Sequence, residues 1–93
     1  MTEDHLASLI ATAEAGKKDK EGWQALPSGR HMTLYGACNG VSLTISRIAA
    51  IKRQGDLLHA RTAKGETYVV ALDLLFAGAA EAAQGSTRKA GFV

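Results

Sequence analysis

Three short turn signals divide the middle of the chain into segments rich in strand-forming residues. They are Asn39-Gly40, Gln54-Gly55-Asp56 and Lys64-Gly65, and each contains a glycine that tolerates the positive φ angles of tight hairpin turns. The runs between them consist largely of Val, Ile, Leu, Thr, Tyr and other residues that suit a half-buried sheet. Residues 31–72 are therefore predicted to form consecutive antiparallel hairpins.

Residues 41–46 alternate between apolar and polar side chains, a pattern typical of a strand with one buried face. If the alternation continued, it would turn Arg47 toward the core. We therefore expect a bulge or bend at Arg47, followed by a new strand over about residues 48–53.

The lengths of the later turns predict which residues face each other across the sheet. If Gly55-Asp56 closes a two-residue hairpin, Lys52 faces His59. If Lys64-Gly65 also forms a two-residue turn, Arg61 faces Tyr68. These four side chains then share one face, although a slip of one residue in either hairpin would exchange the faces.

Both sides of the hairpin region favour helices. Over residues 4–15, an apolar face repeats at helical spacing, Thr2 or Asp4 suits the N-cap, and Gly16 suits the end. The face consists of Leu6, Leu9, Ile10 and Ala13. Residues 74–84 are rich in Ala and Leu and predict a second helix capped by Asp73. Gly78 weakens that helix, and the preceding strand could instead continue to residue 76.

Between the first helix and the hairpins, residues 23–26 suit a short strand that a turn at residues 27–29 would end. We interpret Trp23, the only tryptophan, as a packing residue, because a large aromatic ring buries much apolar area.

Together these patterns predict an α+β fold. Its centre is a bent antiparallel sheet of four to six strands, a meander or half-open barrel, flanked by N- and C-terminal helices. Residues 1–84 form one domain, as expected for a chain of 93 residues, and residues 85–93 form a flexible tail.

The composition of the chain indicates what kind of protein it is and where it acts. With 46% hydrophobic and 22% charged residues the chain is expected to be globular, and a net charge of +2 does not by itself indicate a polyanionic partner. Cys38 is the only cysteine, and an acidic N-terminus lacks the basic region of a signal peptide. We therefore expect a soluble, cytoplasmic, bacterial-type protein without membrane contact.

No residue pattern typical of catalysis or metal binding occurs. His5, His31 and His59 are widely separated, and Cys38 beside a hairpin turn lacks the helix N-terminus that would activate a thiol. Phosphate-binding glycine motifs are also absent. We therefore expect no enzyme activity, metal or cofactor.

The polar face of the later strands is the remaining candidate site. The residues on or beside it that could contact a ligand are Lys52, Arg53, His59, Arg61, Lys64 and Tyr68. Charged and aromatic side chains on a sheet can hold phosphates and stack bases. The same residues could instead be solvated side chains that keep the sheet from aggregating.

We expect a small non-enzymatic binding or regulatory module that acts through a protein partner or as a homodimer. The reason is that Ile48, Leu57, Val70 and Leu72 fall among the charges of the polar face and need a cover, from the terminal helices or a second subunit. The alternative is a nucleic-acid-binding regulator that uses a basic sheet face. That face would consist of Lys52, His59, Arg61 and Tyr68.

Overall fold

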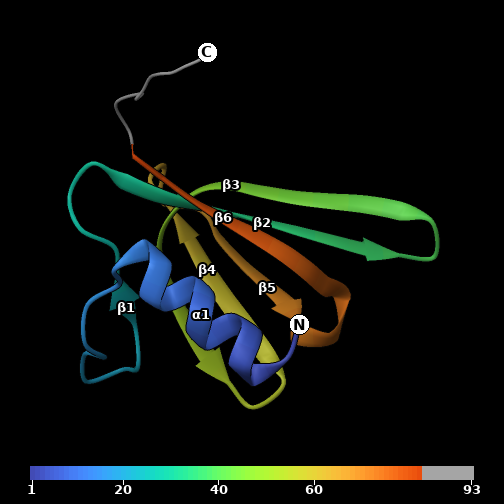
Figure 1. Ribbon diagram of the computed structural model, residues 1–93, viewed down its shortest axis with the longest axis horizontal. Coiled ribbons are helices and arrows are strands. Elements are labelled where there is room, and N and C mark those ends of the chain that lie inside the picture. Colours follow the sequence, from blue (N-terminus) through green and yellow to red (C-terminus); the bar gives the residue numbers. More distant parts are fainter. Residues whose placement is uncertain (83–93) are drawn as a thin grey trace.

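The computed structural model describes residues 1–82, which form one antiparallel sheet with a single α-helix packed against it (Figure 1). In chain order the elements are α1 (Glu3–Ala13), β1 (Gln24–Ala25), β2 (Arg30–Cys38), β3 (Val41–Gln54), β4 (Leu57–Thr62), β5 (Thr67–Ala71), the 3-10 helix η1 (Leu72–Leu74) and β6 (Leu75–Ala82). The strand order is β5-β4-β3-β2-β6, with β1 paired to β3. The antiparallel sheet and the N-terminal helix are confirmed, and the path of strands is open. The tail predicted at residues 85–93 lies outside the described residues.

Strand β3 bends at Arg47, as its alternation predicts. Arg47 has a φ of 57°. The register of β3 shifts close to this residue with both neighbours: between Ile45 and Ile48 in the pairing with β2, and between Ile48 and Ala50 in the pairing with β4. No new strand begins there, because β3 continues through the bend as one strand of 14 residues. Its first half pairs with β2 and its second half pairs with β4 and β1. The bend therefore separates two parts of the sheet.

The β2–β3 hairpin extends beyond the other strands (Figure 1). Its turn is the predicted two-residue one, since Asn39 and Gly40 have φ angles of 51° and 80° and Cys38 pairs with Val41. We call residues 35–44 the arm. Apart from Gly36, its residues are exposed.

The β4–β5 hairpin is closed by three loop residues rather than two. The backbone N–H of Thr62 donates to the carbonyl of Glu66 at 2.8 Å, and Gly65 supplies a φ of 94° at the third loop position. Arg61 therefore pairs with Thr67, not with Tyr68. The β3–β4 register is the predicted one, with Lys52 opposite His59.

This slip of one residue corrects the predicted faces of β5. Val70 is buried in the core, whereas Val69 lies opposite His59 with 55% of its surface exposed. Ile48 and Leu72 are also core residues. Of the four apolar residues expected on the polar face, Leu57 is the one that stays exposed.

Helix α1 packs on β6 and β2 through the predicted residues Leu6, Leu9 and Ala13. The Thr2 hydroxyl caps it by accepting from the backbone N–H of His5. The expected end at Gly16 is wrong, because Glu14 already adopts the left-handed conformation that ends the helix, with a φ of 58°.

The predicted C-terminal helix is a strand. Residues 75–82 form β6 and pair with β2, which would otherwise be a long unprotected sheet edge. Gly78 also fits a close approach of the helix: a Cβ there would overlap the Leu9 side chain and lie 3.2 Å from Leu34 Cδ2. Asp73 caps no helix, since η1 has no side-chain cap. Tertiary pairing here outweighs the helix propensity of alanine.

The core lies between α1 and the concave side of the sheet. Its largest fully buried side chains are Met32, Leu34, Ile48, Ile51, Leu58 and Leu75. Burial of one such side chain stabilises the fold by about 1.5–3 kcal/mol. Within residues 1–82, no helix is long and apolar enough to cross a membrane.

Candidate functional site

Three of the six predicted site residues lie around Trp23, on the face of β3 and β4 that points away from the core. The Arg61 Cζ lies 4.1 Å from the centre of the Trp23 ring and the Lys52 Nζ lies 5.7 Å from it. The His59 ring meets the indole edge to face at 6.3 Å. We call these four residues the Trp23 cluster. Its cations are held partly by the aromatic quadrupole.

Asp19 fixes the backbone on which Trp23 is carried. Its carboxylate accepts hydrogen bonds from the backbone N–H groups of Trp23 at 2.9 Å and Glu21 at 2.8 Å. The Asp19 N–H in turn donates to the Trp23 carbonyl. The hydrogen bonds that the carboxylate accepts lower the pKa of Asp19 below its usual 3.8, and the bond from Trp23 has the largest effect. The nearby positive charge of Arg61 lowers this pKa further.

We expect Asp19 to stabilise the fold only where it is ionised. Because its folded pKa is below the unfolded value, the contribution is complete above about pH 4 and is lost as the pH falls through the folded pKa. Unfolding in urea, followed by Trp23 fluorescence, should therefore show a steeper loss of stability below pH 4 for the wild type than for Asp19→Asn. Parallel pH curves for the two proteins would contradict this role.

Within the Trp23 cluster, the side chains cover the surface that a ligand would need. Arg61 covers a face of the indole, so that face is closed to a stacking ligand. The Nε2 atom of His59 is buried and has no hydrogen-bond partner among the described residues. Trp23 does pack, as the sequence suggests. The sequence does not indicate that it organises the basic residues, because its partners are distant along the chain.

The other three predicted residues lie elsewhere. Arg53 forms an ion pair with Glu3 of α1, and its Nε donates to the Gly55 carbonyl at 2.9 Å. Tyr68 is on the opposite face of the sheet from His59, because it pairs with the inward-facing Ala60. Lys64 belongs to the β4–β5 loop. The single basic face that included Tyr68 is therefore not formed.

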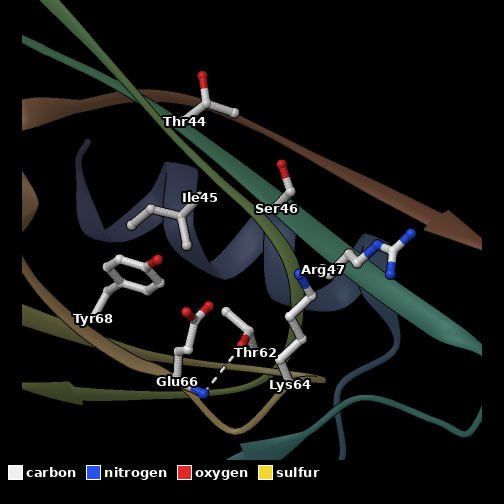
Figure 2. A pocket seen from close by; sticks show the side chains of 8 residues that line it. All are labelled: Thr44, Ile45, Ser46, Arg47, Thr62, Lys64, Glu66 and Tyr68. Carbon is white, nitrogen blue, oxygen red and sulfur yellow. Dashed lines mark hydrogen bonds between the residues drawn. The ribbon is translucent and has the colours of Figure 1, made fainter.

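Tyr68 and Lys64 instead line a depression of about 400 Å³ where β3 diverges from the β4–β5 hairpin (Figure 2). We call it the β3 slot. It is lined by Thr44, Ile45, Ser46, Arg47, Thr62, Lys64, Glu66 and Tyr68. Glu66 and Tyr68 reach toward Ile45 inside the slot, whereas the hydroxyls of Thr44 and Ser46 point the other way (Figure 2).

One wall of the β3 slot is an unpaired strand edge. Among the described residues, those of β3 before the bend pair with β2 alone, since pairing with β4 begins at Ile48. A two-residue turn makes Cys38 and Val41 a hydrogen-bonded pair, and the pairs then alternate. The main-chain groups of Ser42, Thr44 and Ser46 therefore point away from β2. These groups can pair with another strand.

The strand edge at the β3 slot also lacks charges that would discourage such pairing. No Asp, Glu, Lys, Arg or His occurs between His31 and Arg47. Exposed strand edges usually carry charges, prolines or bulges that prevent association. Val41 and Leu43 nevertheless expose 68% and 37% of their surfaces. The uncharged run is visible in the sequence, but the free edge along which it lies is seen only in the structure.

Nothing in residues 1–82 resembles a metal centre, since no three His, Cys, Asp or Glu side chains gather there. A comparison of the chain with protein-family models, curated proteins and solved structures found no match. The geometry of the β3 slot and the Trp23 cluster is thus the basis for a functional assignment.

Proposed function

We propose that the protein is a non-enzymatic binding module that takes up an extended strand of a protein partner along the free edge of β3. The observation that supports this most directly is the row of outward main-chain groups at Ser42, Thr44 and Ser46. In strand addition, main-chain hydrogen bonds provide affinity, and pockets for alternate side chains provide selectivity. The β3 slot offers both.

The side chains around the edge favour an apolar or mixed partner strand. Ile45 and Tyr68 line the slot and would contact the inward side chains of the added strand. Glu66 and Lys64 lie at the hairpin side of the slot, where they can pair with polar groups at its rim. A cytoplasmic location is part of this proposal, because the exposed thiol of Cys38 stays reduced there.

Selection from a phage-displayed library of random unstructured peptides tests the proposal. We expect wild-type protein to enrich apolar peptides that do not bind Thr44→Pro, because proline removes an outward N–H and its ring blocks the edge. Thr67→Pro is the matched control: Thr67 is the first residue of β5, where proline is tolerated, and it does not itself line the β3 slot. Enrichment that Thr44→Pro does not affect would contradict the proposal.

A second candidate is nucleic-acid contact through the Trp23 cluster, supported by the two cations that lie near one indole ring. Binding of this kind weakens as salt rises, because phosphate contacts release counterions. Arg61→Ala and Lys52→Ala should each weaken the binding of single-stranded DNA or RNA at low salt. The absence of any shift with mixed-sequence DNA and RNA would exclude it.

A further inference from the structure

We infer that the strand added to the β3 edge is β3 of a second copy of this chain, so that the two arms pair across a two-fold axis. The inference rests on the proposed function and names its partner. It is supported by the charge pattern of the arm, the protection of the other sheet edges, the arrangement of the exposed apolar side chains and the bend in β3.

The charge pattern of the arm permits pairing with itself. In a strand pair around a two-fold axis, a charged group near the axis lies close to the same charge on its copy, which disfavours association. Because no charged residue lies between His31 and Arg47, two arms can approach without this repulsion.

The other free edges are protected. Edge strand β5 has five residues, and Lys64, Glu66 and Asp73 lie close to its ends. Strand β6 carries Glu81 and lies beneath helix α1. Short edge strands, charges and covering helices are the usual means by which proteins prevent edge association. The edge of β3 has none of these over residues 41–46.

A two-fold axis perpendicular to the sheet makes the paired strands antiparallel and keeps corresponding faces on the same side. Val41 and Leu43 lie on the same face as the buried Ile45, since strand residues alternate. In the pair of arms, Leu43 would lie next to its own copy and Val41 next to Ile45 of the copy. The arrangement would extend the apolar face of the sheet across both subunits and shield Val41 and Leu43 from water.

The bend in β3 sets the register of the pair. The backbone N–H of Ala63 donates to the Arg47 carbonyl at 2.9 Å, and Ile48 pairs with Thr62, so the space beside β3 is filled from Arg47 onward. The turn of the incoming arm must end before that point. This places the axis near Leu43: Leu43 faces its own copy, and the outward main-chain groups of Ser42 pair with those of Thr44 of the copy.

Sedimentation equilibrium over a concentration series, up to the millimolar range, tests this pairing. One short strand pair buries little surface, so we expect the average mass to rise with concentration from 9.8 kDa toward twice that value. Thr44→Pro should remain at 9.8 kDa, whereas Thr67→Pro should behave like the wild type. Circular dichroism of the proline variants checks that both remain folded.

Disulfide trapping provides a second readout. In a Cys38→Ser background, Leu43→Cys should form an interchain disulfide under mild oxidation, because the two positions would face each other across the axis. Thr67→Cys in the same background should stay monomeric. A dimer that tolerates Thr44→Pro and is not trapped through Leu43→Cys would overturn the inference.

A wild-type protein that stays at 9.8 kDa at every concentration would also overturn it. The proposed function fails separately: if peptides bind the β3 edge of a monomeric protein, only the second copy is excluded. If the chain is monomeric and no peptide depends on Thr44, both are excluded.

Discussion

Replacing Ile48 with alanine is expected to lower the free energy of unfolding by about 2–5 kcal/mol, the usual range for truncating a fully buried aliphatic side chain. Ile48 has no exposed surface and pairs with Met32 on one side and Thr62 on the other. It therefore belongs to both parts of the sheet at the point where they meet. A cavity here cannot be closed by movement of a single strand.

Urea unfolding followed by Trp23 fluorescence would measure this loss for Ile48→Ala. Leu57→Ala is the matched control, because Leu57 is an aliphatic residue of the same sheet with 43% of its surface exposed. Its substitution should cost less than about 1 kcal/mol. Equal losses for the two variants would show that the bend is not a critical packing point.

Gly78→Ala is expected to destabilise the protein by about 1–3 kcal/mol through overpacking. The added methyl group would overlap the Leu9 side chain and press α1 away from β6. Because the atom that overlaps belongs to the Leu9 side chain, removing that side chain should relieve most of the strain. A double-mutant cycle with Leu9→Ala should therefore show a favourable coupling between the two substitutions.

Gly36→Ala provides the contrast in this experiment. A Cβ at Gly36 would lie 2.8 Å from the backbone carbonyl oxygen of Leu74, so backbone must shift to admit it. Truncating Leu9 should give no rescue of Gly36→Ala. If Leu9→Ala rescued both glycine variants equally, the specific contact between Gly78 and Leu9 would be refuted.

Features that depend on neighbouring residues could be predicted from the sequence. The two-residue turn at Asn39-Gly40, the cap at Thr2 and the bend at Arg47 each follow from a local pattern. The pairing of Lys52 with His59 also follows, since a two-residue turn fixes the register. In each case the geometry is determined within a few residues of the signal.

Features that depend on distant pairing could not be predicted. The Ala-rich residues 75–82 have the composition of a helix, and the edge of β2 that pairs with them has no signature in that segment. The β4–β5 register depended on one additional loop residue, which moved Tyr68 to the other face. The sequence predicts that Lys52, His59 and Arg61 share a face, but not that Trp23 lies against them, because Trp23 belongs to a distant segment before β1.

The pairing of β6 with β2 affects the order in which we expect the chain to fold. Strands β2, β3 and β4 each pair with the next strand along the chain, so the loops that join them are short and cost little entropy to close. Strand β6 must instead close a loop around the whole meander before Arg30 can meet Ala82. Helix α1 packs chiefly on β6 and can dock only after it. We therefore expect the two ends of the described chain to assemble together after the meander, because nonlocal contacts form more slowly.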